Sequence, residues 1–311
     1  MQTDMKLVRE CNCKKLRQVL RNGKSLTVAQ LAAKTEVSVV TVHALLNDFL
    51  GSGEVVEIPS AAGQKGRPAR CYRLNGAFSL TLVLALYRRK EKNVIDLRLL
   101  DLLGTCLAEE RQWICPADVP AFLLQLVTDF KQQYPALSLV VFGIPGVCTD
   151  GKITRCDCSS LIGWDLGNFP VRTIVENDIN AMVYTHAGTD DVCVGMYVPD
   201  GDAPGVGICI HGHIFRGFAG LAGEVDALLP DCQWYRPEDR AASLSVLVRA
   251  IAFLLNPSRL IVYVQRPDQA EEALFRASLS DRQLGSIEFI SSMEEDYLAG
   301  LAALGLEEFF R

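Results

Sequence analysis

The stretch VRTIVEND, residues 171–178, joins an apolar run to three acidic or amide side chains at its end. Branched apolar residues in a short run are typical of a buried β-strand. In α/β folds, ligands bind where such strands end, so Asn177 and Asp178 are the first candidate ligand contacts. The stretch therefore predicts a strand of an α/β sheet with a site at its carboxyl end.

Strands and helices alternate on both sides of this stretch, from about residue 76 onward. Further strands are predicted for LTLVLAL (80–86), VIDLRLLDL (94–102), LSLVVFGIPG (137–146), DVCVGMYV (191–198), GVGICIHG (205–212) and RLIVYV (259–264). Helical periodicity is present in VPAFLLQLVTDFKQQY (119–134) and LSVLVRAIAFLLN (244–256). The alternation predicts an α/β fold in which helices cover the sheets.

The first 50 residues instead predict three short helices. The first helix has an apolar face formed by Leu7, Leu16, Val19 and Leu20. Thr27 precedes Gln30 by three residues, a capping-box spacing that starts the second helix, VAQLAAK (28–34). Ser38 is placed to cap the third helix, VVTVHALLNDFL (39–50), which is expected to end before the GSG that follows.

The third helix has two distinct faces. Val42, Leu46 and Phe49 recur at helical spacing and form its buried face. The residues left to the outward face, with Thr41 at its edge, are Val39, Val40, His43, Ala44 and Asn47. This face has no Arg or Lys, so any contact with DNA bases falls to Asn47 and His43, with apolar contacts from the other residues.

Two strands flanking a basic loop follow the third helix. EVVEI (54–58) and CYRLN (71–75) are the strands, and PSAAGQKGRPAR (59–70) is the loop between them. This order predicts a winged helix-turn-helix domain over residues 1–75, with its third helix in the DNA major groove. The basic wing residues that would reach phosphates or the minor groove are Lys65, Arg67 and Arg70.

Charge divides the chain at the end of this domain. Residues 1–75 hold twelve Lys and Arg against six Asp and Glu, a net charge of +6. The other 236 residues hold 19 against 31, a net charge of −12. Such segregation is expected when only the first domain contacts a polyanion. It favours double-stranded DNA as the partner over the alternative, a basic helical module that binds protein.

The length of the apolar runs and the use of cysteine argue against a membrane-spanning, exported or zinc-binding protein. No apolar run in the 311 residues approaches the ~20 needed to span a bilayer, and the N-terminus has no apolar signal core, so a cytoplasmic protein is expected. The eleven cysteines are expected to be reduced and mostly buried. The pairs Cys11/Cys13 and Cys156/Cys158 have no second pair at the spacing of a zinc site, so no metal is expected.

Four motifs in chain order resemble the ROK family of repressors and sugar kinases: GRPARCYRLN (66–75), GIPG (143–146), VENDINA (175–181) and GHIFRGFAGLAGEV (212–225). The resemblance covers nearly the whole chain and implies a winged helix followed by a two-lobed, actin-like ATPase (ribonuclease H-like) fold. The lobes would span roughly residues 76–175 and 176–290, with a C-terminal helix returning to the first. It also implies a homodimer or higher homo-oligomer, and a sugar or sugar derivative bound between the lobes.

The resemblance to the kinases of this family is incomplete. It places their catalytic base at Asp178, but LALYRRKEKN (84–93) lacks the glycines and the acid of their first phosphate loop. Asp202 stands where the second phosphate loop has a hydroxyl, and Val264 and Gln265 replace the glycine pair that abuts adenosine. We therefore expect no nucleotide cofactor, and an Asp178 that is catalytically inactive.

The sugar contacts of the family are also reduced. Ser160 and Ala227 replace an asparagine and a histidine, and only Cys232 is left of the zinc motif. The candidate ligand contacts that remain are Gly146, Ser160, Asn177, Asp178 and Glu224, with Gly143 lining the approach. Alternatively, the same polar residues hold the lobes together with no ligand between them.

The sequence thus predicts a DNA-binding transcriptional regulator. Its kinase-like domain would be catalytically inactive and would serve dimerisation and effector binding. Two alternatives stay open: a sugar kinase with a DNA-binding appendage, and a regulator that binds DNA without any effector.

Overall fold

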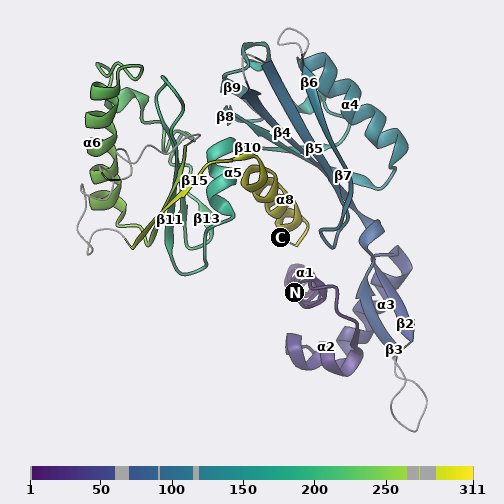
Figure 1. Cartoon of the computed structure of the whole chain (residues 1–311). Helices are drawn as coiled ribbons and strands as arrows, with labels where there is room; N and C mark the ends of the chain where they lie inside the picture. The colour runs from purple at the N-terminus through teal and green to yellow at the C-terminus, as the bar shows by residue number, and fades with distance from the viewer. Residues whose placement is uncertain are drawn as a thin grey trace.

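The computed structural model describes residues 2–59, 70–89, 92–114, 119–264, 273 and 285–310. Two five-stranded sheets form two lobes, and a three-stranded sheet lies in a separate N-terminal body (Figure 1). Within these residues, no helix combines the length and apolar character that crossing a membrane requires. The α/β fold with N-terminal helices that the sequence predicts is confirmed.

The first lobe has a sheet with the strand order β10-β7-β4-β5-β6. Strands β4, β5 and β6 are antiparallel neighbours, and β7 and β10 extend the sheet in parallel. The five strands are β4 (Leu80–Arg89), β5 (Lys92–Leu100), β6 (Cys106–Ile114), β7 (Leu137–Ile144) and β10 (Arg172–Asn177). Helix α4 (Val119–Gln133) covers one face with Leu123 and Val127. Along the chain, a hairpin of β8 (Gly146–Thr149) and β9 (Lys152–Cys156) lies between β7 and β10, which are neighbours in the sheet.

The second lobe repeats this topology with the strand order β13-β12-β11-β14-β15. Three antiparallel neighbours are again followed by two parallel strands. The strands are β11 (Val192–Tyr197), β12 (Gly205–Ile210), β13 (His213–Ile214), β14 (Arg259–Tyr263) and β15 (Ser286–Ile290). Helix α6 (Pro237–Leu255) covers the outer face with Leu244 and Val248. Two copies of one sheet topology are the arrangement of the actin-like ATPase fold.

Two helices lie side by side between the sheets, α5 (Asp178–Tyr184) and α8 (Glu294–Phe310) (Figure 1). They cross so closely that a Cβ atom on Gly300 would lie 1.8 Å from the carbonyl oxygen of Ala181. At its start, α8 is tied to both lobes: Glu295 pairs with Arg98 of β5, and Asp296 accepts a hydrogen bond from Tyr263 of β14. Helix α8 therefore joins the lobes.

The N-terminal body has the order of a winged helix-turn-helix. Its elements are α1 (Gln2–Leu20), β1 (Leu26–Thr27), α2 (Val28–Thr35), α3 (Val39–Ser52), β2 (Val55–Pro59) and β3 (Arg70–Leu74). The predicted capping box of Thr27 and Gln30 is present, and the Ser38 side chain accepts from the backbone N–H of Thr41. The predicted buried face of α3 is confirmed, since Val42, Leu46 and Phe49 are all buried.

Some boundaries and elements differ from the prediction. Leu7 is not part of the buried face of α1, because its side chain is 68% exposed. Helix α3 continues to Ser52 and ends at Gly53, which adopts the left-handed conformation (φ 80°) that favours glycine. Asp178 begins α5 instead of ending a strand, and α6 begins at Pro237, a residue favoured in the first turn of a helix. Among the described strands and α-helices, those missing from the prediction are β1, β6, β8, β9, α5, β13 and β15.

Candidate functional site

The candidate ligand site forms where β10 ends and α5 begins. Asn177 caps the helix, because its side-chain oxygen accepts from the backbone N–H groups of Ile179 and Asn180 at 3.0 and 3.1 Å. The Asn177 amide nitrogen donates to the carbonyl oxygen of Gly146 at 3.2 Å, which ties the helix start to the β8–β9 hairpin. Asn177 thus has a structural role. The sequence pattern alone does not show whether this asparagine caps the helix, binds a ligand or does both.

A buried polar network lies beside this cap. The carboxylate of Glu176, which is 5% exposed, accepts from the side-chain nitrogen of Asn180 at 3.0 Å and pairs with Arg216 of the second lobe. The other side-chain atom of Asn180, Oδ1, is buried and has no hydrogen-bond partner in the part of the chain that the structure describes. A buried acceptor without a partner costs about 1–3 kcal/mol, so Asn180 Oδ1 marks a position where a donor is missing.

Asn180 lines a small cavity between the lobes. The cavity measures about 30 Å³ and is lined by Val147, Asn177, Ile179, Asn180, Gly205, Val206, Gly220, Ala222, Gly223 and Glu224. One water molecule needs roughly 10–15 Å³, so the cavity has room for one or two waters and is too small for a sugar. In this closed arrangement the cavity is too small for the sugar that the resemblance places between the lobes, and the roles of the predicted ligand contacts stay predictions.

An ion pair between the lobes involves Glu224 of the cavity wall. Arg155 of β9 in the first lobe pairs with Glu224 of the second lobe at 3.0 Å, and Asp226 lies 3.7 Å from the same guanidinium group. Glu224 is held there by a glycine turn: Gly223 has φ 92°, and a Cβ on it would lie 1.7 Å from the carbonyl oxygen of Val206. The lobes are thus bridged by Arg155–Glu224 and by Arg216–Glu176.

The other predicted ligand contacts, Gly146, Ser160 and Asp178, are not among the described residues that line the cavity. Asp178 is buried, and Gly146 packs so closely on the hairpin that a Cβ would lie 2.2 Å from the carbonyl oxygen of Arg155. Ser160 is bonded to Cys158, with 3.3 Å between the side-chain oxygen and sulfur. The structure therefore brings Asn177 and Glu224 to one cavity, together with Asn180, which the prediction did not single out as a contact.

Burial changes the acidity of Asp178. Loss of solvent raises the pKa of its carboxyl, the N–H of Ile179 lowers it and the neighbouring carboxylate of Asp157 raises it, and the net result is a pKa of about 7. Because the pKa in the folded state lies above the ~4 of an exposed aspartate, the folded state keeps a proton that the unfolded state loses. Stability therefore falls as pH rises from about 4 to about 7.

Asp178→Asn is expected to remove this pH dependence, since the amide cannot ionise but retains an acceptor for Ile179. We expect the variant to exceed the wild type by on the order of 1–2 kcal/mol in free energy of unfolding at pH 8, and to match it near pH 5. Urea titrations at both pH values measure the difference, with Asp129→Asn on the exposed face of α4 as control. An equal gain at both pH values would contradict the assignment.

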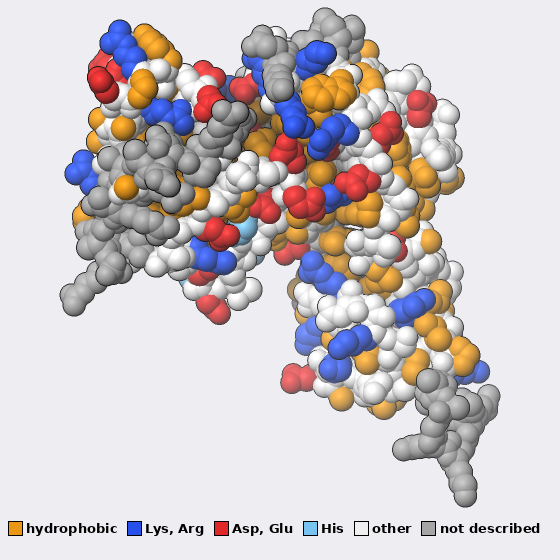
Figure 2. All heavy atoms as spheres, viewed as in Figure 1, with side chains coloured by type: hydrophobic (Ala, Val, Ile, Leu, Met, Phe, Trp, Pro, Cys, Tyr) orange, Lys and Arg blue, Asp and Glu red, His pale blue; other side chains and the backbone are white. Residues whose placement is uncertain are grey.

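The candidate DNA-contacting face lies on α3. Val39 and Val40 are 55% and 80% exposed, and His43, Ala44 and Asn47 are exposed beside them, with Thr41 half-buried. The Asn47 amide and the His43 ring nitrogen Nδ1 are 3.3 Å apart, so the two side chains are already oriented together. The view in Figure 2 shows more blue Lys and Arg side chains than red Asp and Glu side chains on this N-terminal body.

The structure describes only part of the wing. Arg70 begins β3 and pairs with Glu57 of β2 at 3.1 Å, while its side chain stays largely exposed. Lys65 and Arg67 lie outside the described residues, as does Gln265 of the second lobe. The predicted roles of all these residues in DNA or ligand binding stay predictions.

The end of α8 is part of the core of the N-terminal body. Phe310 is 4% exposed and packs with Leu16 and Leu20 of α1, and the Arg21 guanidinium lies 5.1 Å from the centre of its ring. Arg17 forms two hydrogen bonds with the buried Glu54. One helix therefore connects the lobes to the candidate DNA-binding elements.

Comparisons with known proteins bear on this arrangement. No protein-family model matches the chain. It is 24% identical over 250 residues to the xylose repressor of Bacillus subtilis (strain 168) and 23% identical over 247 residues to that of Bacillus spizizenii. Each match covers 73% of this chain and 62% of the relative, so the chain spans less than two thirds of their length.

Solved structures show the same fold. A ROK-family transcriptional regulator, a homologue of the E. coli MLC protein, has a TM-score of 0.59 at 15% identity over 97% of this chain and 99% of its own. The ROK hexokinase of Thermus thermophilus has a TM-score of 0.53 at 15% identity over 73% of this chain and 99% of its own. The chain thus has the fold of these ROK-family proteins, and its sequence is distantly similar to those of two xylose repressors.

Proposed function

We propose that the protein is a DNA-binding transcriptional regulator with a cytoplasmic location and a catalytically inactive, kinase-like domain. The observation that carries the proposal is the outer face of α3, which is exposed on a helix-turn-helix with both helix caps formed. Similarity to the xylose repressors supports the same function. A double-stranded operator would be read by two copies of the chain, since paired half-sites match a two-fold dimer.

Binding to DNA fragments of the source genome tests this function. Asn47→Ala is expected to relax sequence preference by about 1–3 kcal/mol at one base pair, because its amide would contact a base edge. Arg70→Ala is expected to weaken binding to all sequences and to reduce the slope of log K against log salt by about one. Both are measured by fluorescence anisotropy at several salt concentrations, with Arg249→Ala on α6 as control. Binding that is absent or independent of salt would overturn the proposal.

The inter-lobe cavity supports a second element of the proposal, a small-molecule effector of the sugar class. Asn180 Oδ1 has no donor among the residues that the structure describes, and a ligand hydroxyl is one group that would supply it. A sugar fits only after the Arg155–Glu224 pair opens, so binding favours a more open arrangement of the lobes. The alternatives are an effector-independent regulator, in which the network only holds the lobes together, and a sugar kinase with Asp178 as base.

Thermal melting with a panel of neutral pentoses and hexoses separates these alternatives. An effector would raise the melting temperature of the wild type, and more so that of Arg155→Ala, in which the closing ion pair is absent. Arg172→Ala, which removes an ion pair with Glu308 away from the cavity, is the control. No shift in either protein would favour the effector-independent regulator. Sugar-dependent ATP turnover that Asp178→Asn abolishes would establish the kinase instead.

A further inference from the structure

One edge of the first-lobe sheet is formed by the exposed strand β6. It ends the strand order β10-β7-β4-β5-β6, and among the described residues β5 is the only strand with which it pairs. Its nine residues, CLAEERQWI, contain neither Pro nor Lys, two residues with which natural proteins block such an edge. Within the described part of the chain, the outer side of β6 therefore presents backbone N–H and C=O groups that another strand could pair with.

Two apolar side chains of β6 are about half exposed. The exposed fraction is 54% for Trp113 and 50% for Leu107. Tryptophan is enriched in protein interfaces, where its buried ring often supplies a large share of the binding energy. An open strand edge beside apolar side chains favours another polypeptide strand as the partner.

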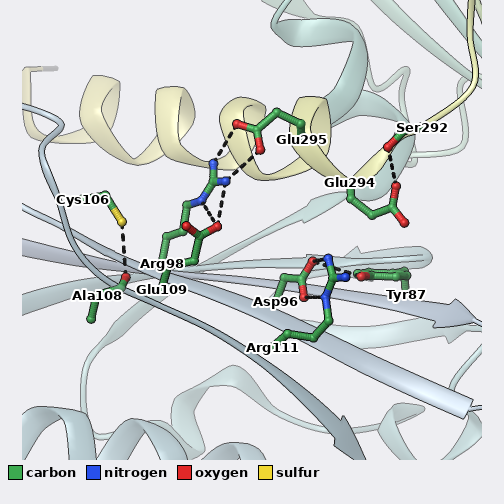
Figure 3. Close-up of polar contacts among 10 residues, drawn as sticks. All are labelled: Tyr87, Asp96, Arg98, Cys106, Ala108, Glu109, Arg111, Ser292, Glu294 and Glu295. Carbon is green, nitrogen blue, oxygen red and sulfur yellow. Dashed lines mark hydrogen bonds and ion pairs between the residues drawn. The ribbon is translucent and has the colours of Figure 1, made fainter.

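Charged side chains alternate in sign across β5 and β6. Glu109 lies opposite Arg98 of β5, and Arg111 lies opposite Asp96. Both couples are ion pairs, at 2.8 and 2.5 Å, on the face of the sheet toward α8, from which Glu295 also pairs with Arg98 (Figure 3). The side chains of Glu109 and Arg111 stay 57% and 43% exposed in these pairs. Each can therefore contact a second opposite charge that comes from beyond the strand edge.

A second copy of the chain presents these charges in the matching order. When two β6 strands pair antiparallel about a two-fold axis at Glu110, Glu109 of each copy lies opposite Arg111 of the other. Two equivalent rows of alternating charge then cross the joint between the copies. Each row has the order Arg98, Glu109, then Arg111 and Asp96 of the other copy.

The charges and the apolar side chains favour the same register. An axis at Glu110 brings Trp113 of one copy beside Leu107 of the other, near the bulge where the register of β5 and β6 shifts. An axis at Glu109 or at Arg111 would place that residue opposite its own copy and separate the opposite charges. An axis between two residues would set side chains of different faces against each other.

The preferred register has one unfavourable contact. Glu110 lies opposite its own copy at the axis, on the other face of the sheet from Glu109. Its carboxylate accepts a hydrogen bond from the Gln112 amide at 2.7 Å, which offsets part of the repulsion. Removal of this charge is therefore expected to strengthen the contact between the two copies.

We propose that β6 is the surface through which two copies of this chain pair, so that their first-lobe sheets join into one sheet across a two-fold axis at Glu110. A second copy is the partner because the order of Glu109 and Arg111 is complementary to itself under that axis. The proposal goes beyond the proposed DNA-binding function, since it assigns the surface that holds two copies together. It is tested without DNA, so either proposal can fail while the other stands.

Sedimentation equilibrium of the full chain in the absence of DNA measures the dissociation constant of the dimer. Trp113→Ala is expected to weaken the dimer at least about tenfold, and Glu110→Gln to tighten it about two- to fivefold. Phe253→Ala, which removes a 66% exposed aromatic ring of α6, is the matched control and should change nothing. A monomeric wild type, or a Trp113→Ala variant that dimerises as tightly as the wild type, would overturn the proposal.

Cysteine cross-linking tests the register. Residues directly opposite each other in antiparallel strands have Cα atoms ~4.5–5.5 Å apart, within the range of a disulfide. Mild oxidation of Glu110→Cys is therefore expected to give a covalent dimer. In the matched control, Gln112→Cys, the two thiols would lie ~13 Å apart along the strands, so no cross-link beyond that of the wild type, with its exposed Cys106, is expected. Failure of Glu110→Cys to cross-link, or equal cross-linking of both variants, would contradict an axis at Glu110.

Discussion

Gly300→Ala is expected to destabilise the two lobes, although alanine favours a helix over glycine by about 1 kcal/mol. The added Cβ would lie 1.8 Å from the carbonyl oxygen and 2.5 Å from the carbonyl carbon of Ala181, so α5 and α8 must move apart. Overpacking of a core costs about 1–3 kcal/mol and more when backbone has to shift. We therefore expect a net loss of about 3 kcal/mol or more.

Tryptophan fluorescence during urea unfolding measures this loss. All three tryptophans, Trp113, Trp164 and Trp234, lie in the two lobes, so their signal reports on the region that Gly300 affects. Gly51→Ala is the matched control: Gly51 is an exposed residue of α3 with no atom within 4 Å of an added Cβ. We expect that control to leave the tryptophan transition in place and to stabilise the N-terminal body slightly. A neutral Gly300→Ala would mean that the two helices do not cross as described.

Much of this fold is predictable because its elements have strong local signals. The buried strands β4, β7 and β14 are continuous apolar runs, and the two caps of α2 and α3 appear in the sequence as Thr27 with Gln30 and as Ser38. Strand β6 has no such signal, because CLAEERQWI is mostly exposed and charged at the edge of its sheet. Helix α5 is only seven residues long, too short for periodicity to separate it from the strand before it.

The site is less predictable than the fold. A motif identifies Asn177 and Glu224, and both line one cavity. The ion-pair partners of the acidic residues near this cavity come from the opposite lobe in each case: Arg155 pairs with Glu224, and Arg216 pairs with Glu176. Their pairing depends on how the lobes sit against each other, which no local pattern specifies. The size of the cavity depends on the same placement, so no local pattern specifies it either.

Phe310→Ala is expected to loosen the N-terminal body from the lobes and to lower its affinity for DNA. Phe310 is 4% exposed in the same core as Leu16, Leu20 and Leu46, so its truncation leaves a cavity among the helices that would hold α3. Burial of this kind is worth about 3–5 kcal/mol for a phenylalanine. Since α8 joins the lobes, the loss also removes one of the contacts between this helix and α1.

Three readouts distinguish a local from a general effect of Phe310→Ala. Tryptophan fluorescence is expected to change little, because the lobes retain their own cores, whereas circular dichroism should show an earlier melting step and anisotropy a weaker complex with DNA. Phe253→Ala is the matched control, since that phenylalanine is 66% exposed on α6 and should affect neither signal. If Phe310→Ala behaves like this control, the C-terminal helix does not support the DNA-binding elements, and movement of the lobes has to reach them through the chain connection between β3 and β4.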